Sequence, residues 1–264
     1  MVIDTRSFSF SFTVLTHNFQ VAQMYMVMKM QQQNTNSTEG VEVLENRPFE
    51  DDEFGKGQYT LKIYRLQRRK LGMHIQGVNQ FMAANFNPTR AVIKCLYFTR
   101  FILTIETIHT AGCGLSDNVH GLTKEQLAIR QVEALDIASD YNDYWSYMIG
   151  ASNFDFSQFQ SAQTGRGPLL DGWQEQCYPV MTAYKLVTID APYWGFGSKL
   201  EQALLAGEKA LFLESHRNCF GWIDEWYGLN VDMMRELEKQ SDSSLNEKLG
   251  RPGLVANGEE LDCS

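Results

Sequence analysis

Apolar and polar residues alternate along several short stretches of the first half of the chain, and a period of two residues is typical of β-strands. Near the start, Phe8, Phe10 and Phe12 alternate with serines. Runs rich in β-branched and aromatic residues lie at 59–66, 91–98, 101–110 and 180–189. These patterns predict a β-sheet built mainly by the first half of the chain.

Two neighbouring segments of the first half give less regular patterns. The stretch GVEVLENRPFE at 40–50 is predicted to be a strand that Pro48 ends, because proline has no N–H for a strand ladder. Residues 17–30 have an apolar start that predicts a short helix. The polar stretch QQQNTNSTEG at 31–40 is predicted to be a mobile loop.

From Thr123 the apolar period changes to that of a helix. Thr123 and Gln126 have the spacing of a capping box, in which the two residues bind each other's backbone N–H groups. Ile129, Val132 and Leu135 then recur at helical intervals. One continuous helix is therefore predicted from Thr123 onward.

Two long helical patterns occupy the C-terminal part of the chain, at 198–223 and from about 232 to 249. Strands that mostly precede long helices favour an α+β fold, a curved antiparallel sheet covered by helices. The sequence has no internal repeat and no long linker. We therefore expect a single domain over residues 1–250 and a flexible tail over 251–264.

Composition narrows the choice of partner and compartment. The 264 residues are 44% hydrophobic and 21% charged, which is ordinary for a soluble globular protein. The formal net charge of -9 argues against a nucleic-acid partner and against purely electrostatic adhesion to anionic membranes. The N-terminus lacks the pattern of a signal peptide, and no stretch approaches the ~18 apolar residues that span a bilayer. The odd number of scattered cysteines favours free thiols in the cytosol: Cys95, Cys113, Cys177, Cys219 and Cys263.

Catalytic signatures are missing. The chain has no GxSxG elbow, phosphate-binding GxxxxGK[ST] loop, HExxH helix or GxGxxG turn after a strand. His109, Cys113 and His120 lie close together, but their spacing fits no zinc finger or ribbon. A strand-end histidine and an ordinary buried thiol are the better interpretation. The sequence therefore predicts a protein that is not an enzyme and binds no metal.

Three polar placements need a partner or solvent. Thr60 and Lys62 share one face of a predicted strand, and Thr107 and His109 share a face of another. Glu238 lies on a mostly apolar stripe of the last helix, where a carboxylate needs a partner. For each placement alone, a solvated position is the simpler interpretation. Together, the three favour a sheet and a helix that enclose an apolar cavity with a polar spot.

Several motifs appear in a characteristic order and spacing: FQVAQMY, EGVEVLEN, GKGQYTLKIYRLQ, IETIH, NVH, VEALDIA, TGRGPL, AYKLVT, WG and FLESHRNCFGWIDEW. In these motifs the chain resembles the phosphatidylinositol transfer proteins, from about residue 15 to 250. The resemblance implies a START-like domain in which a concave, mostly antiparallel sheet and long helices enclose one phospholipid. It also implies a monomer without metal or cofactor that exchanges phosphatidylinositol and phosphatidylcholine between membranes.

The resemblance assigns roles to nine residues of this sequence. Those that match the family's inositol headgroup site are Thr60, Lys62, Asn85 and Glu238. Those that match the surroundings of the phosphate are Gln23, Thr107 and Lys185. The pair that matches the aromatic residues for membrane docking is Tyr193 and Trp194.

The chain departs from the family pattern near the phosphate and in the docking pair. Ala91 stands where the family usually has a threonine near the phosphate, and Tyr193 stands where it usually has a tryptophan. We expect a cytoplasmic carrier that reaches membrane surfaces transiently. The alternative is an interaction protein that senses phosphatidylinositol or presents it to phosphoinositide kinases, with little bulk transfer.

Overall fold

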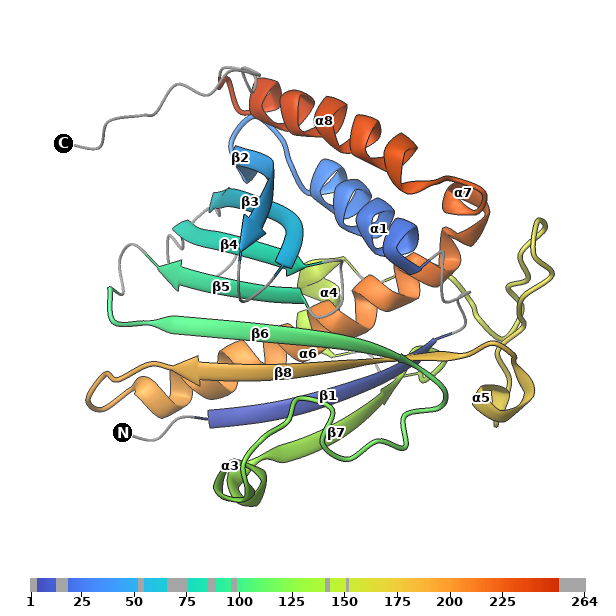
Figure 1. Ribbon diagram of the computed structural model, residues 1–264, viewed down its shortest axis with the longest axis horizontal. Helices are drawn as coiled ribbons and strands as arrows, with labels where there is room; N and C mark the ends of the chain where they lie inside the picture. The colour runs from blue at the N-terminus through green and yellow to red at the C-terminus, as the bar shows by residue number, and fades with distance from the viewer. Residues whose placement is uncertain are drawn as a thin grey trace.

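The computed structural model of the chain describes residues 4–12, 19–51, 55–65, 76–84, 89–95, 99–140, 143–150 and 152–251. Its centre is an eight-stranded sheet in the order β2-β3-β4-β5-β6-β8-β1-β7 (Figure 1). The strands are β1 (Asp4–Phe12), β2 (Gly40–Asp51), β3 (Gly55–Arg65), β4 (Gln76–Ala84), β5 (Thr89–Cys95), β6 (Ile102–Ala111), β7 (Gln131–Asp136) and β8 (Met181–Asp190). Only the β1–β7 pair is parallel, so a mostly antiparallel sheet is confirmed.

Seven helices lie in the described part of the chain: α1 (Phe19–Gln33), α3 (Lys124–Ile129), α4 (Tyr144–Ile149), α5 (Trp173–Gln176), α6 (Gly197–Gly221), α7 (Ile223–Trp226) and α8 (Val231–Lys248). The two long C-terminal helices were both predicted. α6 packs on β1 and β8, α8 packs on β2, and α1 lies between them and contacts both (Figure 1). The α+β class is therefore confirmed.

β2 corrects the prediction that Pro48 ends a strand. The strand continues to Asp51, and Pro48 pairs with Gln58 of β3. β2 is the first strand of the sheet and has a neighbour only on the β3 side. A proline at such an edge leaves no ladder hydrogen bond unmade when its nitrogen points away from the neighbour.

The segment after Thr123 corrects a second prediction. The capping box of Thr123 and Gln126 is present, but α3 ends at Ile129 and β7 begins at Gln131. Val132 pairs with Ser7 of β1 and is 60% exposed, so it does not belong to a buried helical stripe. Pairing with a strand more than a hundred residues earlier overrides the local helical pattern.

Two boundaries in the first half also differ from prediction. α1 extends to Gln33, so its last three glutamines are helical, and the turn to β2 occupies only 34–39. The sequence pattern did not indicate β4, whose stretch QGVNQFMAA has few β-branched residues. β4 forms because it pairs with β3 on one side and β5 on the other.

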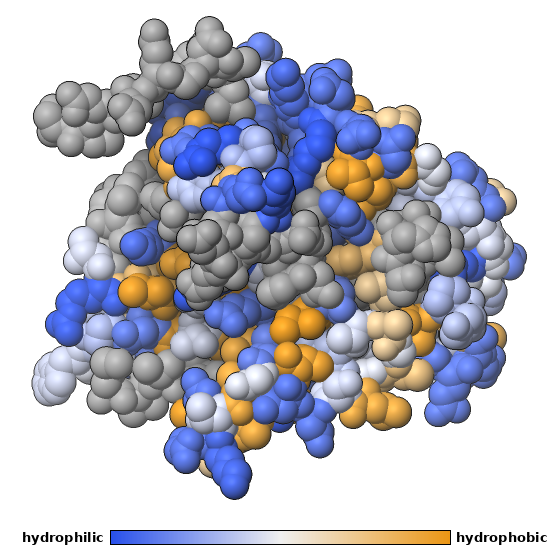
Figure 2. Space-filling model, in the orientation of Figure 1, coloured by the Kyte–Doolittle hydropathy of each residue, from blue (hydrophilic) through white to orange (hydrophobic). Residues whose placement is uncertain are grey.

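The outer surface carries both apolar and polar residues. Figure 2 shows apolar residues scattered among polar ones on the visible face. Among the described residues, no helix combines the length and the apolar character that a bilayer span requires. The main apolar core lies between the helices and the sheet and is built from residues of α1, β6, β8 and α6.

Candidate functional site

Strand register brings the candidate polar residues to one face of the sheet. Paired residues of an antiparallel ladder point to the same side, as do residues two apart on one strand. Thr60 of β3 is in register, through β4 and β5, with Ile105 of β6. Thr107 lies two residues further along β6 and pairs with Lys185 of β8. Thr60, Lys62, Thr107 and Lys185 therefore all face the helices.

Lys62 lies under α1 and α8. Its Nζ donates a hydrogen bond to Oε1 of Gln31, at 2.8 Å. Burial lowers the pKa of Lys62, while the carboxylates of Asp242 and Glu238 act in the opposite direction. A lysine in this setting keeps its charge only with help from nearby acceptors, and it is available to donate to a ligand.

Glu238 has a nearer cation than Lys62. Its Oε2 accepts a hydrogen bond from Nη1 of Arg235, three residues earlier on α8, at 2.5 Å. Burial raises the pKa of Glu238, and the attraction of Arg235 and then of Lys62 lowers it. Lys62 and Glu238 thus attract each other through space, and the hydrogen-bond partner of Glu238 is Arg235.

Thr60 belongs to a hydrogen-bonded group that joins β2, β3 and α8. Its Oγ1 donates to Oδ1 of Asn46, at 3.3 Å, and the same oxygen accepts from Nε2 of Gln58, at 2.6 Å. Nδ2 of Asn46 donates to Oδ2 of Asp242, at 2.7 Å. Thr60 and Asp242 are buried, with 8% and 3% of their surfaces exposed.

A second polar group surrounds Lys185. It lies on the same face of the sheet as the first group, but on other strands. Nζ of Lys185 donates to Oγ1 of Thr107, at 3.3 Å, and lies 4.8 Å from the ring centroid of Phe212. A cavity of about 20 Å³ opens here, and it is lined by Phe19, Gln23, Met26, His109, Lys185, His216 and Cys219. Oε1 of Gln23 is buried and has no hydrogen-bond partner within the described part of the chain.

Burial dominates the electrostatics around Lys185. It lowers the pKa of Lys185 to about 8, although Glu208 of α6 raises it. Burial raises the pKa of Glu208 to about 7, although the attraction of Lys185 lowers it. Burial also lowers the pKa of His216 to about 3, and the positive charge of Lys185 acts in the same direction. Within the described residues, Oε2 of Glu208 is buried without a hydrogen-bond partner. Lys185 and Thr107 are hydrogen-bond donors of the kind that an anionic group accepts from.

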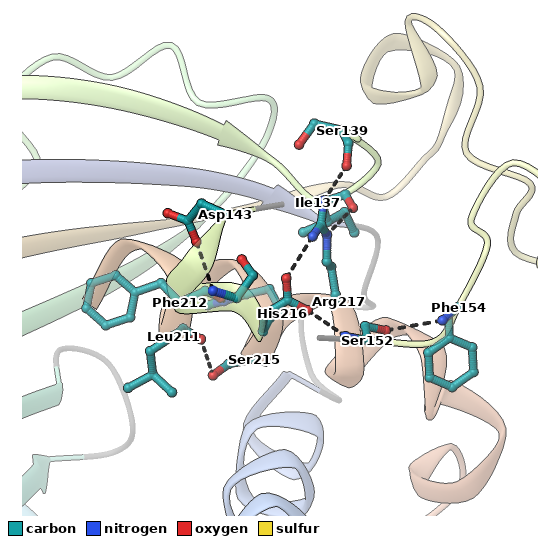
Figure 3. Close-up of polar contacts among 12 residues, drawn as sticks. Ile137, Ser139, Asp143, Ser152, Phe154, Leu211, Phe212, Ser215, His216 and Arg217 are labelled. Atoms are coloured by element: carbon teal, nitrogen blue, oxygen red, sulfur yellow. Dashed lines mark hydrogen bonds and ion pairs between the residues drawn. The ribbon is translucent and has the colours of Figure 1, made fainter. Parts of the chain in front are cut away.

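Buried contacts of Arg217 fix the position of α6 beside this group (Figure 3). Its Nε donates to the carbonyl of Ile137 at 3.1 Å, and its Nη2 donates to the carbonyl of Ser139. Nη1 forms an ion pair with Glu214 at 2.8 Å, and Glu214 also accepts from the backbone N–H of Ser152. These bonds tie the helix that carries Glu208, Phe212 and His216 to the end of β7.

The protonation of Glu208 makes a testable contribution to stability. Between about pH 5 and 7 the folded protein holds a proton on Glu208 that the unfolded chain has released, so this group's stabilisation is lost as the pH rises. We expect Glu208→Gln to gain about 2 kcal/mol of unfolding free energy relative to the parent over this interval, and no more above it. Lys185, His109 and His216 face the same space and are present in both the parent and the variant, and the substitution also removes the attraction by which Glu208 raises the pKa of Lys185.

Urea unfolding of the parent and the Glu208→Gln variant between pH 5 and 8 measures this difference. Glu236→Gln, at an exposed position on α8, is the control for removing a glutamate carboxylate. A Glu208→Gln difference that stays constant with pH would contradict a shifted carboxyl at this position.

Comparison with known proteins identifies the family. A family model described as phosphatidylinositol transfer protein matches residues 4–243. The chain belongs to the phosphatidylinositol transfer protein family. It is 33% identical over 253 residues to cytoplasmic phosphatidylinositol transfer protein 1 of Drosophila melanogaster, which covers 92% of this chain and 91% of that protein.

Two further members of the phosphatidylinositol transfer protein family show how the match is distributed. Phosphatidylinositol transfer protein 2 of Dictyostelium discoideum is 35% identical over 241 residues, covering 88% of this chain and 91% of the relative. Membrane-associated phosphatidylinositol transfer protein 2 of Homo sapiens is 33% identical over 263 residues, covering 92% of this chain but 18% of that longer protein. The resemblance predicted from the motifs is thereby confirmed.

The remaining residues that the family resemblance assigns lie in different settings. Asn85 is outside the described residues. Trp194, in the loop between β8 and α6, is fully exposed. Tyr193 is instead half-buried, stacks on Phe196 with ring centroids 5.3 Å apart, and accepts a hydrogen bond from the N–H of Arg100. The two aromatics are therefore not equivalent, and only Trp194 is fully open to solvent.

The weak zinc candidates are not gathered into one group. His109 packs against the ring of Phe19, with centroids 3.7 Å apart, and a ring nitrogen of His120 lies 3.2 Å from the carbonyl of Glu106. Cys113 is exposed, so its assignment as a buried thiol was wrong; it lies just after β6 ends, in a turn. Across the described segments, no group of three or more His, Cys, Asp or Glu side chains is arranged to hold a metal ion.

Several residues near the candidate sites were not singled out from the sequence: Gln31, Asn46, Thr89, His216 and Asp242. Thr89 is buried and pairs with Thr107, which in turn pairs with Lys185, so Thr89 lies on the same face of the sheet as these two residues. Ala91 lies on the same face, two residues further along β5. Asn46 pairs with Thr60 across a hairpin, a relation that an alignment of the two predicted strands would have indicated.

Proposed function

We propose that this chain is a non-enzymatic phospholipid carrier. It binds one phosphatidylinositol or phosphatidylcholine molecule inside the protein and exchanges it between membranes. The observation that carries the proposal is the pair of buried polar groups, around Lys62 and around Lys185, on the helix-covered face of one sheet. Membership of the phosphatidylinositol transfer protein family supports the same function.

The separation of the two groups supports a division of roles. Lys62 on β3 and Lys185 on β8 are four strand spacings apart, which is about 19 Å across the sheet. Both candidate lipids carry a phosphodiester, which accepts hydrogen bonds from Lys185 and Thr107. Only phosphatidylinositol carries ring hydroxyls, which both donate and accept, and Lys62 and Glu238 supply a donor and an acceptor for them. Phosphatidylcholine therefore depends on the Lys185 group alone.

The acyl chains require an enclosed carrier. Two chains hold about 30 methylenes, and at about 0.8 kcal/mol each their exposure to water costs on the order of 25 kcal/mol. The cavity of about 20 Å³ beside Lys185 has room for about one water molecule. A lipid needs far more room than this cavity gives beside Lys185, and we propose that the helices and the sheet separate to provide it while the protein is docked on a membrane.

Trp194 is the side chain best placed for that docking. With a net charge of -9, attraction to an anionic bilayer has to come from apolar contact, and tryptophan favours the membrane interface. We expect Trp194→Ala to weaken vesicle binding and to slow transfer of both lipids about tenfold. Vesicle co-sedimentation and a fluorescent-lipid transfer assay measure the two effects.

Tyr178 provides a matched control for Trp194, because it is 95% exposed and lies in a different loop. Tyr178→Ala is expected to leave binding and transfer unchanged. Equal losses in the two variants would show that general surface hydrophobicity, not the loop before α6, governs membrane contact. Docking of this kind is consistent with a cytoplasmic protein that meets membranes transiently.

The proposed function is tested first by identifying the bound lipid. The purified protein is extracted with organic solvent, and the extract is analysed by mass spectrometry alongside a transfer assay. About one phosphatidylinositol or phosphatidylcholine per chain, with transfer of both, is the expected result. Bound phosphatidylinositol without measurable transfer would favour the alternative, in which the protein presents the lipid to phosphoinositide kinases. A folded protein without phospholipid would overturn both.

A further inference from the structure

Asp242 is a buried carboxylate beside the proposed inositol site, and no sequence motif assigns a role to it. It lies one turn after Glu238 on α8, with 3% of its surface exposed, and its hydrogen bond comes from Nδ2 of Asn46, at 2.7 Å. A buried carboxylate is costly unless its environment compensates for the lost water. Its placement near Lys62 therefore calls for a reason beyond packing.

The bond to Asp242 fixes the orientation of the Asn46 amide. An ionised carboxylate only accepts hydrogen bonds, so the NH₂ group of Asn46 must face Asp242 and the amide oxygen must face the opposite way. That oxygen accepts from Nε2 of Gln58 at 2.6 Å and from Oγ1 of Thr60 at 3.3 Å. The carboxylate on α8 thus determines which atom of Asn46 is presented to Thr60.

A bulge in β2 and a second amide hold this arrangement in place. The register shifts between Val43 and Glu45, and this shift brings Asn46 opposite Thr60. Asn246, one turn after Asp242, accepts from the N–H of Val43 at 2.8 Å and donates to its carbonyl at 2.9 Å. α8 is therefore anchored at the bulge, and Asp242 and Asn46 are held at a fixed distance.

The orientation of Asn46 determines what Thr60 offers to a ligand. Thr60 uses its single hydroxyl proton toward the oxygen of Asn46, which leaves the lone pairs of Oγ1 as its remaining capacity. Thr60 then accepts from a ligand hydroxyl, while the neighbouring Lys62 donates to one. A ring with adjacent hydroxyl groups satisfies both residues, and a choline group, which has no hydroxyl, satisfies neither.

We propose that Asp242, acting through Asn46, is a positioning residue that sets the headgroup preference of the site. It keeps Thr60 as an acceptor beside the donor Lys62, and this pattern selects a polyol headgroup over choline. The inference rests on the proposed carrier function. It adds to that function the pair of residues that makes the inositol site selective.

Asp242→Asn is the sharpest test, because it preserves shape while giving position 242 a donor group. The side chain can then donate to Asn46, so the amide of Asn46 is free to turn over and Thr60 loses its fixed role. We expect phosphatidylinositol transfer to fall about tenfold, the effect of one misplaced hydrogen bond to a charged network, while phosphatidylcholine transfer is unchanged. Glu236→Gln removes a charge from an exposed position of the same helix and is expected to change neither.

Coupling to Thr60 separates a positioning role from a structural one. If Asp242 acts through Asn46 on Thr60, the Thr60→Val/Asp242→Asn double variant is no worse in phosphatidylinositol transfer than Thr60→Val alone. Asn46→Ala removes the link and is expected to reproduce the selective loss, which keeps the test available if Asp242→Asn fails to fold. Additive losses, or equal losses for both lipids, would overturn the positioning role.

The parent protein in the same assay keeps this inference distinct from the function on which it rests. A parent that carries neither lipid would overturn the carrier function itself. A parent that carries both lipids, with Asp242→Asn and Asn46→Ala variants that keep its phosphatidylinositol preference, would overturn only the role of Asp242.

Discussion

Replacing Lys62 with methionine is expected to reduce phosphatidylinositol transfer between tenfold and 100-fold and to leave phosphatidylcholine transfer unchanged. Methionine keeps most of the volume of the side chain under α1 and α8 but removes its donor hydrogens. A hydrogen bond to a charged group contributes about 1.5–3 kcal/mol, and the substitution also leaves Oε1 of Gln31 without the donor that lies 2.8 Å away. Phosphatidylcholine has no hydroxyl for Lys62 to bind, so the loss should be confined to one lipid.

Transfer assays with each lipid in separate donor vesicles measure the effect. Lys94→Met is the control, because Lys94 is an exposed lysine on β5 of the same sheet. It is expected to behave as the parent does. An equal fall for both lipids in Lys62→Met would mean that Lys62 holds α1 against the sheet through Gln31, and that it does not select a headgroup.

The fold was predictable where local pattern and tertiary pairing agree. β3, β6, β8, α6 and α8 have strong local patterns, and each forms the type of element that its pattern predicts. Prediction failed where pairing with a distant segment decides the outcome. Val132 has helical spacing from Ile129, yet it lies on a strand because β1 offers a free edge.

For the candidate site, the sequence predicts which residues share a face of a strand, and no more than that. Alternation places Thr60 and Lys62 together, but it does not say whether that face meets solvent or helices. The answer depends on α1 and α8, and on contacts such as Asn46 with Asp242, which are 196 positions apart in the sequence. No short-range pattern encodes a contact of that kind. The register shift in β2, which turns Asn46 toward Thr60, is likewise visible only in the folded chain.

Replacing Lys185 with methionine is expected to reduce transfer of both lipids by at least tenfold, in contrast to the Lys62 variant. The phosphodiester is common to the two lipids, and Lys185 is the cation of the group that contains Thr107. Without it, an anionic phosphate would lie buried beside Glu208, and an unpaired buried charge is strongly unfavourable. Binding of either lipid should therefore fail for the same reason.

The folded state without lipid should tolerate this change. Burial already lowers the pKa of Lys185 to about 8, which shows that the ammonium is held there at a cost, and methionine removes that cost. We expect an unfolding free energy at neutral pH no lower than that of the parent, so lost transfer is not explained by lost folding. Lys199→Met, at an exposed position of α6, is the control for lysine removal. If the Lys185 variant lost transfer of phosphatidylinositol alone, the phosphodiester could not bind at Thr107 and Lys185, because a group common to both lipids cannot produce a selective loss.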